Sequence, residues 1–300
     1  ASIWGALLNA RRVDIIAEED RFDLDKINQY LTQPERFAVA YIPPILLANL
    51  SPDPKANIIP RIVISGEAVA QDLVDNYLEK TCLINAYGPT ENSVCSSYHI
   101  YQKGDDANLI GQAIPDVMTL VLDEYLNPVP SGVVGQLYLA GVGLARGYLN
   151  QAELTNNVFI EPSEKHPFRL YKTGDLVKEN RAGQLSFEGR IDDQVKLRGF
   201  RIELGEIEKT LETHPHVIRA KVLVTQALNK QKQLTAYLIH TADYQALLTE
   251  LFHQLSSKLP DYMVPQAWAE LDAWPLTANG KLAKAELPVA YPISAGAKVQ

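Results

Sequence analysis

Residues 85–91, Asn-Ala-Tyr-Gly-Pro-Thr-Glu, gather an aromatic ring, a hydroxyl and a carboxylate directly after an apolar, strand-like run. Ligand crevices in open α/β sheets lie at the carboxyl ends of strands. There the Tyr87 ring can stack on a purine, the Thr90 hydroxyl can donate to a phosphate, and Glu91 can help to hold Mg²⁺, which prefers oxygen ligands. A Gly-Pro pair alone indicates only a turn, so the three neighbouring side chains are what favours a binding site.

Three further segments carry polar groups that could bind or react, although each has a simpler explanation. Asp175, in Thr-Gly-Asp, has two acceptor oxygens that suit the two hydroxyls of a ribose, but aspartates are common in turns. Residues 189–208 interleave charged and apolar residues, which predicts a solvated hairpin followed by a helix from about Leu204. Lys281 follows an Asn-Gly turn without the preceding glycine of a Walker A loop, so by itself it indicates a surface charge.

Composition excludes several classes of protein. The 300 residues suit about two domains, and 46% apolar with 21% charged residues is typical of a folded chain. The net charge of −8 argues against general binding to nucleic acid. Two cysteines, Cys82 and Cys95, exclude a disulfide scaffold and a four-thiolate zinc site, and they fit a cytoplasmic protein. The longest apolar run, residues 37–50, contains two prolines and is too short to cross a bilayer, so no membrane partner is expected.

The pattern of apolar residues changes twice along the chain. Over residues 1–115, helix-like and strand-like segments alternate, which predicts an α/β layer with a largely parallel sheet. The segments expected there are Leu24–Leu31 and Ala70–Lys80 as helices, and Val13–Ile16, Phe37–Ile42, Arg61–Ile64 and Thr81–Tyr87 as strands. Residues 116–192 predict a mostly antiparallel unit similar to a small β-barrel. Residues 193–290 predict a small α+β domain with helices at Gly205–Thr213 and Tyr244–Lys258, and residues 291–300 predict a linker.

Taken in order, these segments resemble the motifs of the adenylation domains of nonribosomal peptide synthetases. Those domains belong to the superfamily of adenylate-forming enzymes, with acyl-CoA synthetases and luciferases. The matching segments are residues 85–91, 137–150 (LYLAGVGLARGYLN), 171–176, 189–208, 259–265 (LPDYMVP) and 279–281. The resemblance covers essentially the whole chain. Gln-Val-Lys at 194–196, followed by RIELGEIE at 201–208, favours the amino-acid-activating branch.

The resemblance implies how the nucleotide would be held. Tyr87 would stack on adenine with Gly66 beside the base, and Thr90 would contact the α-phosphate. Asp175 and Arg190 would hold the ribose. ATP is therefore the implied cosubstrate.

The resemblance also implies catalytic, metal-binding and hinge residues. Glu91 would help to place Mg²⁺, and Lys281 would bridge the substrate carboxylate and the α-phosphate. Asp192 would be the hinge between the large and small domains. Thr90, Glu91 and Lys281 are thus the implied catalytic residues.

A substrate pocket follows from the same resemblance. Its implied residues are Ala1, Tyr41, Val63, Ser65, Ala86, Val94, Cys95 and Lys281. Most of these are small or apolar, which predicts an apolar or aromatic amino acid as substrate. Simple core packing would explain Val63, Ala86 and Val94 equally well.

The activity implied is formation of an aminoacyl-adenylate from an amino acid and ATP, with release of pyrophosphate. Transfer to the phosphopantetheine thiol of a carrier domain would follow, with neighbouring synthetase domains as partners in secondary metabolite biosynthesis. Two alternatives stay open: an acyl- or aryl-CoA ligase of the same superfamily, and a truncated non-catalytic remnant. Because no Ser/Thr/Gly-rich loop of the type TSGTTGKPKG occurs, the resemblance implies the C-terminal part of such a domain without the upstream half of its large subdomain. Whether this segment is active alone stays open.

Overall fold

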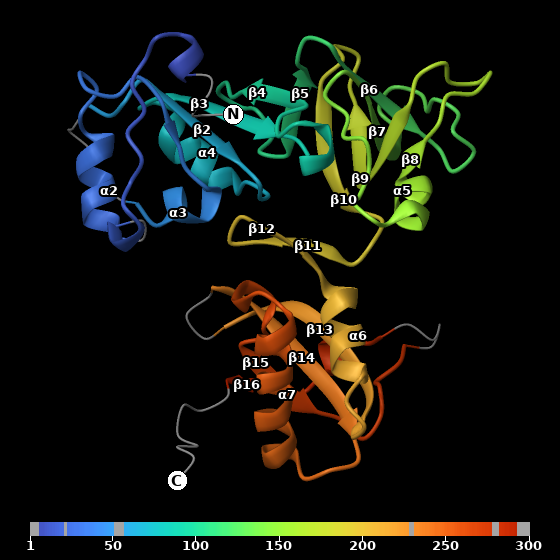
Figure 1. Cartoon of the computed structure of the whole chain (residues 1–300). Coiled ribbons are helices and arrows are strands. Elements are labelled where there is room, and N and C mark those ends of the chain that lie inside the picture. The colour runs from blue at the N-terminus through green and yellow to red at the C-terminus, as the bar shows by residue number, and fades with distance from the viewer. Residues whose placement is uncertain (1–5, 21–22, 51–56, 228–230, 278–281, 293–300) are drawn as a thin grey trace. The chain divides into compact units, whose positions relative to one another are not determined.

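The computed structural model describes residues 6–20, 23–50, 57–227, 231–277 and 282–292 (Figure 1). The chain divides into two compact units, Ala1–Asp192 and Asp193–Gln300. Each unit has its own apolar core.

The first unit begins with an α/β layer. Strands β1 (Ala40–Tyr41), β2 (Arg61–Ser65) and β3 (Cys82–Tyr87) are parallel neighbours. Their helices are α2 (Leu24–Leu31), α3 (Pro44–Ala48) and α4 (Gln71–Leu78), and short 3₁₀ turns lie at η1 (Glu18–Asp20) and η2 (Thr90–Asn92). The apolar sides of α2, α3 and α4 share one buried cluster with alternate residues of β2, so these helices cover one face of the layer. The predicted parallel α/β layer is confirmed.

The rest of the first unit is antiparallel. It contains β4 (Ser97–Ile100), β5 (Leu109–Ala113), β6 (Val117–Leu122), β7 (Val134–Gly141), helix α5 (Ala152–Val158), β8 (Phe159–Ile160), β9 (Leu170–Glu179) and β10 (Leu185–Arg190). Hydrogen bonds join these strands to the parallel layer in the order β1-β2-β3-β4-β5-β10-β9-β7-β6, with β8 paired to β9. The path ends at β6 within the described residues, so the hydrogen bonding does not close into a ring.

One predicted strand is absent. Val13–Ile16 has no regular structure, and Ile15 is 75% exposed. In the described part of the chain no strand lies beside it, and a strand needs a neighbour for its hydrogen bonds. The predicted strand Phe37–Ile42 shortens to β1 for the same reason, because only Ala40 and Tyr41 pair with β2.

The second unit is an α+β domain. Its elements are the hairpin β11 (Gln194–Leu197) and β12 (Phe200–Glu203), α6 (Leu204–Glu212), β13 (Val217–Gln226), β14 (Lys232–His240), α7 (Tyr244–Lys258), η3 (Asp261–Met263), β15 (Ala267–Glu270), η4 (Lys284–Glu286) and β16 (Tyr291–Pro292). The four-stranded sheet has the order β13-β14-β15-β16, with β14 and β15 parallel. Leucines spaced four apart on α7, such as Leu251 and Leu255, are fully buried against this sheet's core. Strand β16 falls within the segment predicted as a linker.

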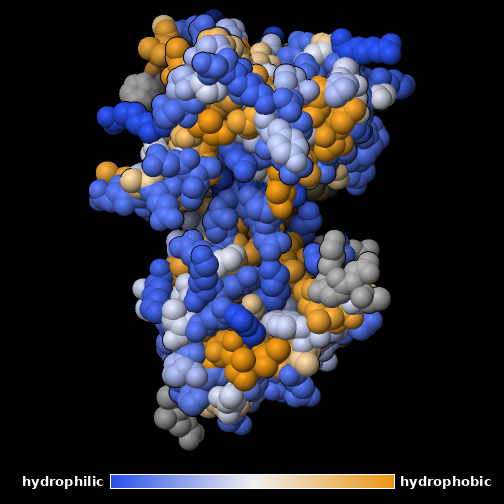
Figure 2. Space-filling view, turned by 90° about the vertical axis from the view of Figure 1, so that its right-hand side faces the viewer, coloured by the Kyte–Doolittle hydropathy of each residue, from blue (hydrophilic) through white to orange (hydrophobic). Residues whose placement is uncertain are grey.

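The surface carries hydrophobic residues in separate patches. Figure 2 shows such patches among hydrophilic side chains on both units. No helix in the described ranges is long and apolar enough to span a membrane. The cytoplasmic location stays a prediction.

Candidate active site

The residues after β3 form a tight turn. A side chain on Gly88 would lie 2.4 Å from the Val94 carbonyl oxygen, so only glycine fits. The Ser96 N–H donates to the Tyr87 carbonyl at 2.7 Å, which folds the turn back onto the strand. Thr90 and Glu91 lie on η2 at this turn, with Thr90 exposed and Glu91 only 7% exposed.

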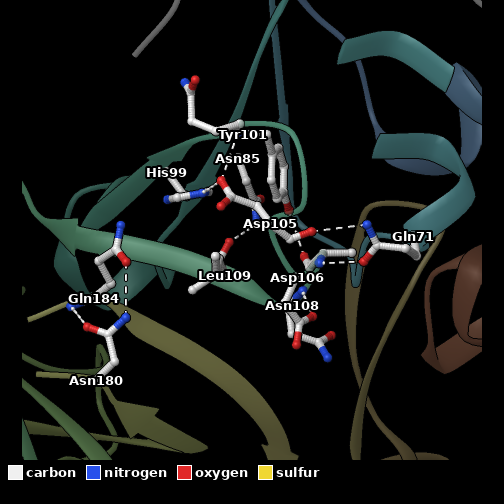
Figure 3. Close-up of polar contacts among 12 residues, drawn as sticks. Gln71, Asn85, His99, Tyr101, Asp105, Asp106, Asn108, Leu109, Asn180 and Gln184 are labelled. Carbon is white, nitrogen blue, oxygen red and sulfur yellow. Dashed lines mark hydrogen bonds and ion pairs between the residues drawn. The ribbon is translucent and has the colours of Figure 1, made fainter. Parts of the chain in front are cut away.

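The base of the turn is fixed by a polar network (Figure 3). The Asn85 amide donates to the Leu109 carbonyl at 2.9 Å, which ties β3 to the start of β5. Opposite Asn85 in the sheet, His99 contacts Asp105 at 2.7 Å. The Gln71 side chain bonds the backbone of the same loop twice, at the Asp105 carbonyl and the Ala107 N–H. Asn85 therefore has a structural task, which is to hold the strand that ends at the turn.

Asp175 links two other predicted nucleotide-binding residues, Tyr87 and Arg190. It lies on β9, is 3% exposed, and faces Arg190 across the pair β9–β10. The Tyr87 hydroxyl donates to Asp175 Oδ2, and Arg190 Nη1 donates to Asp175 Oδ1. One buried hydrogen-bond network thus joins the segments 85–91, 171–176 and 189–208.

Tyr87 takes part through its hydroxyl. The ring is 6% exposed and belongs to the core cluster around Leu137 and Leu139. Burial raises the pKa of Tyr87 well above its ordinary value, and the negative charge of Asp175 raises it further. The hydroxyl therefore stays protonated and donates. Stacking of adenine on this ring stays a prediction.

Arg190 also forms a two-pronged ion pair with the predicted hinge residue. Its Nε and Nη2 lie 2.6 and 2.7 Å from the two carboxylate oxygens of Asp192. Burial opposes the charge, but Asp192 and Asp175 outweigh it and raise the pKa of Arg190. Gly174 makes room for this pair, because a Cβ there would lie 2.6 Å from Arg190 Nη2 and 2.8 Å from Asp192 Oδ2. Asp192 is also the last residue of the first unit.

Glu91 is held from two sides. Its carbonyl accepts from the Ala145 N–H at 2.8 Å, and the Tyr148 hydroxyl donates to Oε1 at 2.5 Å. A carboxylate oxygen is a suitable ligand for Mg²⁺. No group of three His, Cys, Asp or Glu in the described part of the chain could hold a metal.

Four predicted pocket residues share one face of the sheet. Register pairs Tyr41 with Val63 and Ser65 with Ala86, and residues paired in register point to the same side. The next residue in this row is Tyr98 on β4, which lies opposite Ala86 and is 45% exposed. The sequence prediction missed Tyr98, because the four residues of β4 are too few for their alternation between buried and exposed positions to stand out in the sequence.

The other predicted residues lie at the rim or outside the described residues. Gly66 follows β2 with a φ of +86° and open space around it, and Val94 is 61% exposed. Cys95 is half-buried, and burial raises the pKa of its thiol. Lys281 and Ala1 lie outside the described residues.

Comparison with known proteins gives consistent results. The model of the family "AMP-binding enzyme" matches residues 1–149. Bacitracin synthase 1 of Bacillus licheniformis is 39% identical over 95% of this chain, which spans 6% of that protein. Novobiocin biosynthesis protein H of Streptomyces niveus is 41% identical over 84% of this chain, which spans 42% of it. The structure of holo-PA1221, an NRPS protein containing adenylation and PCP domains, matches with a TM-score of 0.73 and 31% identity over 86% of this chain and 46% of its own.

The chain belongs to the AMP-binding enzyme family. Within that family it is part of an adenylation domain of the nonribosomal peptide synthetase type, as its ordered motifs predict. It spans less than half the length of each of the relatives named above.

Proposed function

We propose that this chain contributes to the activation of an amino acid by ATP and to its transfer onto a carrier domain. In the first step a carboxylate oxygen of the amino acid attacks the α-phosphorus of ATP. The bond between the α- and β-phosphates breaks, and pyrophosphate leaves. In the second step the phosphopantetheine thiol loses its proton, the sulfur attacks the acyl carbon, and AMP leaves.

The assembly around Asp175 is the observation that carries this proposal. Three separate segments supply Tyr87, Asp175 and Arg190. These side chains form one buried hydrogen-bond network beside the turn that carries Thr90 and Glu91. Such a rigid polar cluster suits a reaction that depends on positioning, since a carboxylate with a pKa of about 4 is already ionised and needs no base.

The remaining roles extend from this cluster. Glu91 would supply one oxygen ligand to Mg²⁺, which when bound neutralises charge on the phosphates. Lys281 would stabilise charge on the reacting carboxylate and phosphate, and losing such a donor costs roughly a hundredfold or more in rate. The face that carries Val63, Ser65 and Ala86 would take an apolar or aromatic amino-acid side chain.

ATP–pyrophosphate exchange over a panel of amino acids and simple carboxylic acids tests this proposal. The variants are Lys281→Ala and the matched control Lys284→Ala, since Lys284 is an exposed lysine three residues away. We expect exchange that depends on one amino acid, loss of at least a hundredfold in Lys281→Ala, and little change in the control. If the chain is silent, the same assay is run on a longer chain that includes upstream sequence.

The other candidate functions make different predictions in this assay. Exchange driven by a simple acid rather than an amino acid would favour an acyl- or aryl-CoA ligase. Silence of both the chain and its extended form would favour a non-catalytic remnant and would refute the proposed activity.

A further inference from the structure

We propose that Tyr148 is a positioning residue for Glu91 and thereby tunes metal binding at the site. This inference rests on the proposed function, because that function gives Glu91 its task. Tyr148 lies in the segment 137–150, whose part in the chemistry the sequence leaves unassigned.

The contact is direct and well enclosed. The Tyr148 hydroxyl donates to Glu91 Oε1 at 2.5 Å, and the Glu91 residue is 7% exposed. A carboxylate oxygen can only accept, so the Tyr148 phenol is the donor of this hydrogen bond.

Tyr148 is itself held in place from several sides. Its N–H donates to Thr155 Oγ1 at 2.9 Å, and its ring packs edge-on against Phe159, with 5.9 Å between ring centres. Phe159 packs in turn on Tyr171, which lies on β9 four residues before Asp175. The hydroxyl thus comes from a rigid aromatic group that also borders the strand carrying Asp175.

The backbone adds a second constraint. Gly147 has a φ of +147°, and a Cβ there would lie 2.5 Å from a Thr155 side-chain carbon. Arg169 donates to the carbonyls of Ala145 and Arg146, just before this glycine, at 2.7 and 2.9 Å. These contacts fix residues 145–148 as a unit against η2.

A fixed donor on one oxygen sets the plane of the carboxylate. Without this bond the carboxylate would have more freedom to reorient, and it would lose more entropy on binding a cation. Partners that orient a metal ligand typically contribute 10- to 100-fold to metal affinity. Removing only the Tyr148 hydroxyl should therefore weaken metal binding by roughly tenfold or more.

The test compares Tyr148→Phe with Tyr138→Phe. Tyr138 lies in the same unit, is 3% exposed, and its hydroxyl donates to Gln136 at 3.2 Å, so this control also removes one buried hydroxyl. Binding of Mn²⁺ in the presence of ATP is measured from the free Mn²⁺ signal in electron paramagnetic resonance, against a titration with ATP alone, because ATP itself binds Mn²⁺. We expect the dissociation constant to rise about tenfold in Tyr148→Phe and less than twofold in the control.

Exchange activity provides the second measurement. The Mg²⁺ concentration for half-maximal exchange should rise in Tyr148→Phe, while the KM for the amino acid stays unchanged. Equal Mn²⁺ affinity in wild type and Tyr148→Phe, or equal weakening in both variants, overturns the inference while an active wild type leaves the proposed function intact. If neither the wild-type chain nor its upstream-extended form binds Mn²⁺ with ATP or shows exchange, both the inference and the proposed function are overturned.

Discussion

Replacing Arg190 with methionine should strongly destabilise the first unit. The Arg190 side chain is 10% exposed and the Asp175 side chain 4% exposed, with 2.5 Å between Nη1 and Oδ1. Methionine fills similar space but leaves the Asp175 carboxylate buried without its cation. Breaking a buried pair in this way costs about 3–5 kcal/mol.

The assay must report on the first unit alone, because a chain with two units need not unfold in one step. Hydrogen–deuterium exchange of β9 and β10, followed by mass spectrometry, meets this need, and peptides from β13 and β14 serve as an internal reference. A loss of 3–5 kcal/mol corresponds to exchange that is faster by roughly 10²- to 4 × 10³-fold.

The same two strands offer a matched control. Lys178 on β9 pairs with Glu188 on β10 at 2.9 Å, but the two side chains are 42% and 31% exposed. Lys178→Met should therefore cost less than about 1 kcal/mol. Adding Asp175→Asn to Arg190→Met should recover at least half of the loss, because no buried charge is then left unpaired.

Two results would refute this reasoning. One is an effect of Arg190→Met no larger than that of Lys178→Met. The other is a double variant, Arg190→Met with Asp175→Asn, that is no more stable than Arg190→Met alone.

Three further predictions concern single positions. Burial raises the pKa of Tyr77 to about 12. The contribution of its neutral phenol to the free energy of unfolding is therefore complete below pH 10 and is lost as the pH rises towards 12. Between pH 10 and 12 the free energy of unfolding, measured with urea, should fall more steeply in the wild type than in Tyr77→Phe. The difference between the two slopes should be about 1.4 kcal/mol per pH unit. Gly174→Ala should destabilise the first unit more than Gly183→Ala, as hydrogen–deuterium exchange of β9 and β10 would show. Both have positive φ, near +77° and +73°, but a Cβ at Gly174 also meets Arg190, whereas one at Gly183 makes only ordinary contacts. Tyr98→Ala should raise the relative exchange rate for bulkier amino acids by roughly tenfold or more, and an unchanged profile would remove Tyr98 from the pocket.

Helices α2 and α7 could be predicted to the residue because each carries its own boundary signals. The Asp23 side chain accepts from the N–H groups of Asp25 and Lys26, and Asp243 accepts from that of Ala246. Apolar residues then recur at helical spacing, and a proline, Pro34 or Pro260, follows within three residues of the last helical residue. Such signals are local, so the sequence alone is enough.

The short strands could not be predicted in the same way. Strands β4, β5 and β15 have four or five residues, too few for an alternating pattern to stand out. Val13–Ile16 shows the opposite error, since it is apolar enough for a strand but has no neighbour in the described residues. Strand formation depends on a partner that lies far away in sequence.

The sequence was enough to predict which residues belong to the candidate site, but not how those residues contact one another. Motif order identified Tyr87, Asp175 and Arg190, but nothing in the sequence indicated that Tyr87 would donate to Asp175 through a buried hydroxyl. Tyr148 lies in a recognised segment, yet its contact with Glu91 joins residues 57 positions apart. Such contacts depend on how the loops fold over the sheet.

The pairing of Asp175 with Arg190 depends on an irregularity in the sheet. Phe187 lies opposite Val177 and Arg190 opposite Asp175, so the register shifts by one residue between them. With unbroken pairing from Phe187 onwards, Arg190 would lie opposite Gly174 instead, and a shift of one residue turns side chains to the other face. The shift occurs between Phe187 and Gly189, and the φ of +125° at Gly189 is open to glycine and costly for other residues. Gly189 therefore belongs to the site through the register that it permits, although it carries no side chain to touch a ligand.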